Sequence, residues 1–247
     1  MKIMTLLRNM KAVLLSLAIL MPGITTAKGL KENPTDFHLG VGLATKYIWR
    51  GLESATAPVI APTIFYNNKG FNVFVFGAYS FDGDYRELDY GLSYTYRWFT
   101  IGATDYFYPS PAGESDNYFN FKNKTTGHSI ETYVTLAPEK VPLWLTLSTF
   151  IYGADHRTDG RQAYSSYAEL GYNYNFKEIH NLSLTLGAAL NKGMYTDYEG
   201  GFNVVNIELK YQIDIPIGHF SLPLSGAYIL NPYNKKSYFD FGLSFEY

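Results

Sequence analysis

The sequence predicts an all-β protein, a transmembrane antiparallel up-and-down β-barrel of about 12 strands. The main indication is the last segment, residues 238–247, in which apolar and polar side chains alternate up to the final tyrosine. A secretory leader at the N-terminus is the second indication. The third is the recurrence of alternating segments of about ten residues separated by connectors, which is typical of membrane barrels.

The terminal segment places Phe239, Phe241, Leu243, Phe245 and Tyr247 on one face of a strand. In a soluble protein, an unpaired strand edge with an apolar face favours aggregation. A closed barrel in lipid removes the edge and surrounds the apolar face with hydrocarbon. The aromatic C-terminal residue also resembles the signal by which the barrel-assembly machinery recognises bacterial outer-membrane barrels, so we expect that machinery to be a partner through this strand.

The first 27 residues have the pattern of a cleaved signal peptide. Basic residues precede an apolar run at 12–21, and small residues ending at Ala27 form a cleavage site. The apolar run is shorter than the roughly 20 residues that a membrane-spanning helix needs. The chain contains no cysteine, which excludes a lipoprotein anchor, disulfides and thiolate metal sites. We expect residues 28–247 to form one barrel domain in the outer membrane of a Gram-negative bacterium.

The composition agrees with a barrel whose wall separates lipid from water. Hydrophobic residues make up 47% of the chain, with 23 Tyr and 17 Phe, yet the mean hydropathy is −0.12. Alternation explains both values, because each strand has one face in lipid and one in water. The net charge of −2 gives no electrostatic reason to expect a nucleic-acid partner.

The N-terminal half is expected to hold five strands, at residues 37–49, 57–67, 71–81, 86–97 and 99–108. Pro58 and Pro62 disturb the alternation of the second strand. In the fifth strand Asp105 would share a face with apolar residues, so the sequence does not decide which face is inward. A polar segment at 109–128 follows. Because it is longer than ordinary loops, we expect it to fold into the lumen or to cover its mouth.

The C-terminal half is expected to hold seven strands, at residues 130–136, 143–151, 166–176, 182–190, 205–213, 220–228 and 238–247. With the N-terminus in the periplasm, the short connectors near 67, 98, 138, 177 and 214 fall on the periplasmic side. The longer segments at 109–128 and 154–164 then fall outside the cell, as is typical of outer-membrane barrels.

Aromatic residues near the strand ends predict girdles at the two membrane interfaces. The residues that carry this prediction are Tyr47 with Trp49, Tyr94 with Trp98, and Tyr172 with Tyr174.

Charged residues on the polar face of the strands are expected to line the lumen. These candidate pore-lining residues are Lys46, Arg50, Glu87, Asp89, Arg97, Glu131, Glu169, Glu208, Lys210 and Asp240. Their acidic excess would favour cations or polar solutes. The alternative is that they pair with one another in a filled interior. Small and polar residues dominate the rest of this face. The bore of a 12-stranded barrel is wider than the filled interior of a barrel of about eight strands and narrower than the aqueous channel of roughly 16 to 18 strands. We therefore favour a water-filled path.

Two groups of residues are candidate catalytic sites of a hydrolase. His128 and Ser129 are adjacent, so they would point to opposite faces of a strand rather than towards each other. Asp155, His156 and Asp159 could imitate the acid–histidine pairs of a barrel protease, although a solvated external loop accounts for them better.

Cofactor and metal sites have no clear pattern in the chain. Gly40 and Gly42 lack the third glycine and the helix of a dinucleotide-binding loop. No group of His and Asp residues has metal-ligand spacing. We therefore expect no catalytic residue, no bound cofactor and no metal.

Short aromatic motifs in the first half carry a family resemblance. They are Tyr47-Ile48-Trp49-Arg50-Gly51, Pro58 through Pro62, Gly70-Phe71, Glu87-Leu88-Asp89-Tyr90 and Tyr106-Phe107-Tyr108-Pro109. In these motifs the chain resembles the TorF-type family of predicted bacterial outer-membrane porins, and the second half matches only the general barrel pattern. The resemblance implies a porin of undefined substrate and no catalytic residues.

Three functions are consistent with this sequence. The leading hypothesis is a porin-like channel for passive diffusion of small hydrophilic solutes. The second is a plugged barrel whose external loops bind a surface partner, with 109–128 as the binding segment. The third is an outer-membrane hydrolase that uses His128 or His156.

Overall fold

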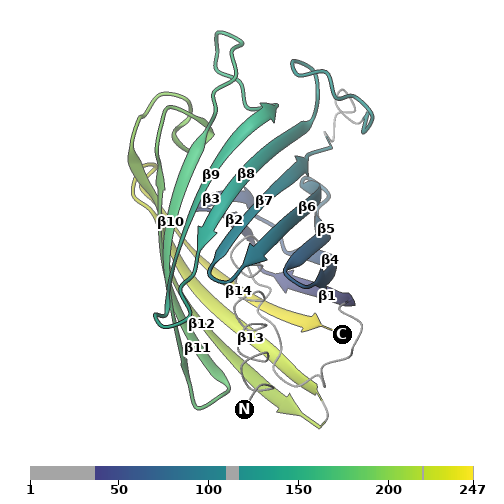
Figure 1. Cartoon of the computed structure of the whole chain (residues 1–247), viewed down its shortest axis with the longest axis vertical. Coiled ribbons are helices and arrows are strands. Elements are labelled where there is room, and N and C mark those ends of the chain that lie inside the picture. The colour runs from purple at the N-terminus through teal and green to yellow at the C-terminus, as the bar shows by residue number, and fades with distance from the viewer. Residues whose placement is uncertain (1–36, 110–116, 219, 247) are drawn as a thin grey trace.

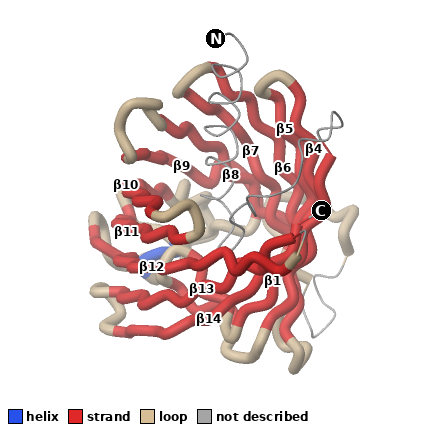
Figure 2. The backbone as a smooth tube through the Cα atoms, turned by 90° about the horizontal axis from the view of Figure 1, so that it is seen from below, coloured by secondary structure: helices blue, strands red, loops and turns tan. Residues whose placement is uncertain are grey.

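The computed structural model describes residues 37–109, 117–218 and 220–246, so the predicted signal peptide lies outside the described residues. The described chain forms a closed barrel of 12 antiparallel strands (Figures 1 and 2), which confirms the predicted fold class. The barrel strands are β1 (Phe37–Ala44), β4 (Val59–Asn68), β5 (Phe71–Ser80), β6 (Arg86–Tyr96), β7 (Phe99–Phe107), β8 (His128–Leu136), β9 (Leu143–Gly153), β10 (Ser166–Phe176), β11 (His180–Ala189), β12 (Asn203–Ile217), β13 (Phe220–Asn231) and β14 (Lys236–Glu246).

Two further strands lie outside the ring order. β2 (Tyr47–Trp49) and β3 (Leu52–Ala55) pair only with each other, and a 3-10 helix, η1 (Met194–Thr196), lies in the β11–β12 connector. None of the described residues belongs to a helix long and apolar enough to cross a bilayer.

Closure of the barrel depends on the first and last strands. β1 pairs with β14 on one side and with β4 on the other. Leu43, for example, lies opposite Leu243 in β14 and Ile60 in β4. The apolar C-terminal strand therefore has a neighbour on each side, as predicted, and the wall has no free edge.

The outer face of the wall is apolar. Leu92, Ile101, Leu184 and Phe241 project outward and are between 48% and 60% exposed. An apolar surface that encircles a closed barrel needs hydrocarbon around it. The architecture therefore places the chain in the bacterial outer membrane.

The two ends of the barrel differ in the length of their connectors. The end that carries the start of β1 and the end of β14 has the short connectors 69–70, 97–98, 137–142, 177–179 and 218–219. The connectors between β7 and β8, β9 and β10, and β11 and β12 lie at the opposite end and are longer (Figure 1). This asymmetry is the one predicted for short periplasmic turns and longer external loops.

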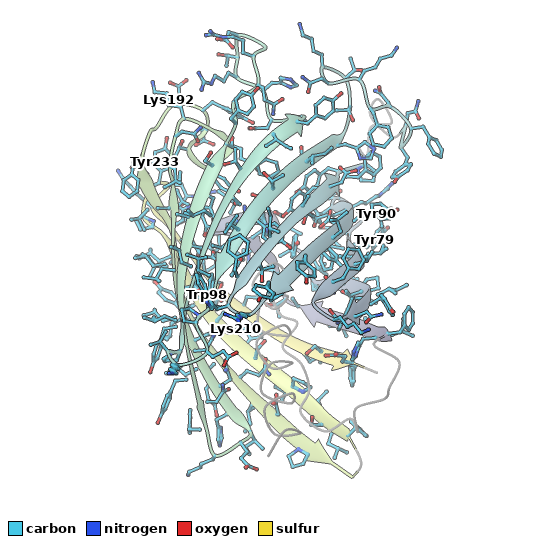
Figure 3. The ribbon with its side chains drawn as sticks, in the orientation of Figure 1. Tyr79, Tyr90, Trp98, Lys192, Lys210 and Tyr233 are labelled. Atoms are coloured by element: carbon cyan, nitrogen blue, oxygen red, sulfur yellow. The ribbon has the colours of Figure 1, made fainter. Side chains whose placement is uncertain are left out.

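Four of the six predicted girdle residues are on the outer surface. Tyr94 and Trp98 are each 49% exposed, Tyr172 is 38% exposed and Tyr174 is 51% exposed, near the short-connector end (Figure 3 labels Trp98). Tyr47 and Trp49 were wrongly placed in this girdle.

The first predicted strand, 37–49, ends at Ala44 instead, and the chain then enters the lumen as the β2–β3 hairpin. Arg50 and Gly51 have φ angles of 50° and 78° and form a two-residue turn between Trp49 and its partner Leu52. Alternation continues through residues 45–49, so the sequence imitates a longer strand. The apolar side chains of the hairpin are covered by the inner wall rather than by lipid.

Large aromatic rings on the inner wall lie over glycines of the neighbouring strand. The four pairs are Phe74 over Gly91, Tyr133 over Gly102, Trp144 over Gly171 and Tyr167 over Gly187. A Cβ atom would lie 2.0 Å from the Phe74 ring at Gly91, 2.4 Å from the Tyr133 ring at Gly102 and 2.1 Å from the Trp144 ring at Gly171. At Gly187 it would lie 1.8 Å from the Tyr167 hydroxyl oxygen. Glycine therefore allows each ring to lie against the wall, which leaves more of the lumen free.

We predict that Gly171→Ala forces the Trp144 indole away from the wall and destabilises the barrel by about 1–3 kcal/mol, the usual cost of overpacking. Unfolding in urea from lipid vesicles measures this difference. Gly42→Ala is the matched control, because its Cβ would meet its nearest neighbour at 3.8 Å. Equal stability of the two variants would contradict the ring-over-glycine packing.

Candidate functional site

The inner hairpin, residues 47–55, crosses the lumen and contacts the wall on three sides. Tyr47, Ile48 and Trp49 are only 6%, 6% and 7% exposed. They belong to three buried clusters, whose other members include Phe65, Phe74 and Phe76 for Tyr47; Ile229 and Tyr238 for Ile48; and Tyr106, Phe150, Tyr167, Tyr195 and Val205 for Trp49. These other members come from β4, β5, β7, β9, β10 and β12–β14 and from η1. The hairpin is therefore the structural element that narrows the bore.

The tip of the inner hairpin is fixed by a buried ion pair. Arg50 Nη1 and Nη2 donate to the two carboxylate oxygens of Glu131 on β8, at 2.6 and 3.0 Å. The Arg50 and Glu131 side chains are 8% and 0% exposed. Tyr106 Oη donates to the same carboxylate at 3.0 Å, and Arg50 Nη1 also donates to Tyr195 Oη. Such a bidentate pair sets both the position and the orientation of the guanidinium.

Aromatic rings and backbone contacts also hold the tip of the inner hairpin. The Arg50 guanidinium lies 4.5 Å from the centroid of Trp49 and 4.6 Å from that of Tyr167. Asn231 Nδ2 donates to the Gly51 carbonyl at 3.1 Å. A Cβ at Gly51 would lie 2.0 Å from the Val205 carbonyl oxygen, so the tip approaches β12 at backbone distance.

The base of the inner hairpin is held at β14. Asp240 Oδ1 accepts hydrogen bonds from Thr45 Oγ1 at 2.8 Å and from the Lys46 amide at 3.1 Å. Lys46 Nζ donates to Glu53 Oε1 at 2.6 Å and so pairs within the hairpin region. A hollow beneath the hairpin is lined by Tyr47 and Ile48 above and by Glu208, Lys210, Ser225, Asp240 and other wall residues around it.

Three further carboxylates on the inner wall face tyrosines. Glu87 accepts from Tyr85 Oη at 2.9 Å, and Glu169 accepts from Tyr167 Oη at 2.6 Å. Asp89 is 4% exposed. Within the described part of the chain none of these three carboxylates has an ion pair with a lysine or arginine at 4 Å or less. The inner wall therefore carries acidic groups that have no close ion pair among the described residues.

Several buried oxygens on the inner wall lack a protein hydrogen-bond partner. Among the described residues they include Asp89 Oδ1, Thr104 Oγ1, Ser148 Oγ and Asn206 Oδ1. Buried polar atoms are almost always satisfied by protein or by ordered water. These positions therefore favour a hydrated interior around the hairpin.

Nine of the ten predicted pore-lining residues lie on the inner wall or on the inner hairpin and its base. Lys46 and Arg50 reach the lumen through the hairpin and not through the first strand. Arg97 is misplaced in the prediction: β6 ends at Tyr96, and Arg97 lies in the exposed turn with φ of 58° and its guanidinium 5.2 Å from the Tyr96 ring. The turn reverses the chain in two residues, so the strand parity does not extend to Arg97.

Tyr106, Tyr167 and Tyr195 were not predicted as partners of Arg50. Tyr106 was undecided because Asp105 disturbed the parity of β7. Asp105 in fact lies on the outer face, where it pairs with His128. The Arg50-Gly51 pair between two aromatic-rich stretches was a usable signal of a hairpin. No sequence signal identified Tyr195, which comes from η1 in a loop.

The long connector between β7 and β8 does not enter the lumen in its described part. Residues 117–127 lie instead against the outer face of the wall, while 110–116 fall outside the described residues. His128 Nδ1 is 2.9 Å from Asp105 Oδ2, and Nε2 is 2.7 Å from the Tyr118 carbonyl oxygen. Phe121 stacks on the imidazole with centroids 4.2 Å apart. The expectation of a lumenal or mouth-covering segment is therefore wrong for 117–127.

Neither candidate histidine has the geometry of a hydrolase. Both ring nitrogens of His128 are bonded, and Ser129 is on the opposite face of β8. His156 bridges to Gln162 in the external β9–β10 loop.

The acids beside His156 have structural partners. Asp155 accepts from the Ser165 amide and hydroxyl at 2.8 and 2.5 Å. Hydrogen bonds from Arg161 lower the pKa of the Asp159 carboxyl. The hydrolase hypothesis gains no support from this loop.

Comparisons with known proteins agree with the fold. Neither the scan against protein-family models nor the search of curated proteins gave a match. A chain from work on the in-meso crystallization of membrane proteins is similar with a TM-score of 0.51 and 8% identity, over 85% of this chain and 83% of that chain. Two porins have TM-scores of 0.49 and 10% identity. The match to KdgM covers 85% of this chain and 97% of KdgM, and the match to NanC covers 83% of this chain and 97% of NanC. At these identities the comparisons support the barrel fold alone, and the resemblance to the TorF-type family stays a prediction.

We predict that Arg50→Met destabilises the protein by about 3–5 kcal/mol, because it leaves the Glu131 carboxylate buried without a partner. The double variant R50M/E131Q removes both charges and should recover a large part of that loss. Urea unfolding in lipid vesicles measures the three proteins. A double variant no more stable than R50M would contradict the assignment of Glu131 as the main partner of Arg50.

Proposed function

We propose that this outer-membrane barrel is a channel for passive diffusion of small hydrophilic solutes, with the inner hairpin as its constriction. The observation that carries the proposal is a polar inner wall that is partly open to water beneath a single, firmly anchored hairpin. Asn173, Ser183, Thr185, Lys210 and Ser225 face inward and are neither buried nor fully exposed. Such a wall suits solutes that keep their hydration.

The hairpin determines which solutes could pass. It occupies the middle of a 12-stranded barrel, whose bore is already narrower than that of porins with roughly 16 to 18 strands. The passage beside it is bounded by polar and aromatic side chains and by fixed acidic groups. This arrangement favours small polar solutes over large ones.

The charge of the wall favours cations. Without Arg97, the predicted lumenal set contains six carboxylates against three bases. Two of the bases are neutralised at close range, Arg50 by Glu131 and Lys46 by Glu53. Glu87 and Asp89 lie two residues apart on β6, and neither forms an ion pair with a lysine or arginine of the described chain. A low-dielectric wall with this excess raises the local concentration of positive solutes.

Removing the hairpin tests the constriction. Because Ala44 pairs directly with Val59, a short Gly-Ser-Gly linker can replace residues 47–55 without breaking the β1–β4 ladder. We expect the single-channel conductance in planar bilayers to rise severalfold, since the bore then approaches the full width of the barrel. Shortening the external β9–β10 loop is the matched control and should leave conductance within a small factor of the original. If neither the original protein nor the protein without residues 47–55 conducts, the channel proposal is contradicted.

Selectivity is tested separately. We expect E87Q/D89N to shift the reversal potential in a KCl gradient towards that of an unselective pore, because it removes two uncompensated acids. R97Q, in the exposed turn, is the charge-changing control and should have no effect. An unchanged reversal potential in E87Q/D89N would rule out these residues as determinants of cation preference.

A plugged barrel is the second candidate, and the burial of Tyr47, Ile48 and Trp49 favours it. In that case the intact protein does not conduct, whereas the protein without the hairpin does. The same recordings therefore distinguish a constriction from a plug.

A further inference from the structure

The segment 117–127 covers the outer face of the barrel at its external end. Tyr118 contacts Tyr90 of β6 and Phe107 of β7, with centroids 6.1 and 5.3 Å apart. Tyr152 Oη of β9 donates to the Phe121 carbonyl at 2.6 Å, and the Gly153 amide donates to Asn123 Oδ1 at 3.1 Å. The segment is thus fixed across β6 to β9, outside the ring of strands.

His128 fixes the segment from beneath. Its side chain is 0% exposed and lies between Phe107, Tyr118 and Phe121. Oxygen atoms face both of its ring nitrogens. One ring nitrogen bonds the Asp105 carboxyl group of the wall and the other bonds the Tyr118 carbonyl, so the ring joins the wall to the segment backbone. This bonding makes 117–127 an ordered surface.

The outward side of this surface combines exposed aromatic rings with positively charged side chains. Phe119 is 83% exposed and Phe121 is 45% exposed. Lys122 and Lys124 are also exposed, and neither forms an ion pair within the part of the chain that the structure describes. Arg86, at the external end of β6, is exposed on the same outer face.

The height of this surface on the barrel indicates its partner. The segment contacts Tyr90 through Tyr118, and Figure 3 labels Tyr90 and Tyr79 on the same flank of the barrel. Tyr79 is 47% exposed on the outer face and pairs with Arg86 in the ladder. Aromatic rings at strand ends mark the membrane interface. Phenylalanines at this level reach acyl chains, and lysines reach the charged head groups of the lipid.

We propose that residues 117–127 bind a phosphorylated lipid of the external leaflet, with Lys122 and Lys124 on its phosphates and Phe119 among its acyl chains. Charge complementarity and the place of the segment on the wall, away from the mouth, carry this assignment. The site is independent of conduction through the lumen. It anchors one flank of the barrel to the anionic lipid around it.

Binding to lipid A tests the proposal. The full-length barrel in neutral detergent is titrated with bisphosphorylated lipid A and with its dephosphorylated form, and native mass spectrometry gives the bound fraction. Each basic side chain near an anionic lipid surface contributes roughly fivefold to binding. We therefore expect K122Q/K124Q to weaken binding of the phosphorylated form about 25-fold and to leave the dephosphorylated form unaffected.

Controls separate this site from general charge and from misfolding. K140Q/K177Q removes two exposed lysines at the short-connector end and should bind as the original protein does. F119S should weaken binding of both lipid forms, because it removes an acyl contact. All variants are checked for the folded, heat-modifiable form on gels. Equal affinity of K122Q/K124Q and the original protein, or equal affinity of the original protein for both lipid forms, would overturn the proposal.

Discussion

A chain in hydrocarbon must satisfy every backbone N–H and C=O group within itself, and this constraint determines the structure. Antiparallel pairing all the way round, with β1 joined to β14, meets it without an exposed edge. Because the barrel is closed, one face of each strand contacts lipid and the other faces the lumen. The apolar outer belt and the polar inner wall are two consequences of the same hydrogen-bonded ring.

Closure of the barrel creates a polar interior, and the inner hairpin folds into it. Its backbone leaves the ring at Ala44 and needs polar partners inside the barrel. Asn231 supplies one at the Gly51 carbonyl and Asp240 another at the Lys46 amide, while the Glu131 carboxylate holds the Arg50 side chain. Burial of Tyr47, Ile48 and Trp49 against the wall contributes apolar stabilisation, at roughly 25 cal/mol per Å² removed from water. The Arg50–Glu131 pair adds positional precision more than net stability, since desolvation offsets much of its Coulomb energy.

Alternation predicted most of the fold. The strand at 238–247 and those from 130 to 228 follow a period of two, because each residue faces either lipid or lumen, and the inward carboxylates Glu87, Glu131 and Glu169 followed from it. The prediction was wrong where a tertiary contact or a turn, and not the strand period, determines the side-chain orientation. Tyr47 and Trp49 keep the alternation but face an apolar patch inside the lumen, a tertiary contact that local pattern does not contain. Arg97 belongs to a tight turn.

The segment 109–128 shows a second limit of sequence reasoning. Its length indicated a special role, but composition alone does not distinguish a segment that enters the bore from one that folds back over the lipid face. The deciding contact, His128 with Asp105, needs the outward orientation of Asp105. The sequence left that orientation open.

The structure places the inner hairpin inside the lumen, where Ile48 packs against β13 and β14. Because the chain has no native cysteine, the pair Ile48→Cys and Ile229→Cys reports this contact cleanly, since both positions pack in one cluster. The measurement is disulfide formation between them in isolated outer membranes after mild oxidation. The account predicts an efficient cross-link that a reductant reverses. Failure to cross-link, with the cysteine at position 48 freely modified by a bulky, membrane-impermeant maleimide, would contradict it.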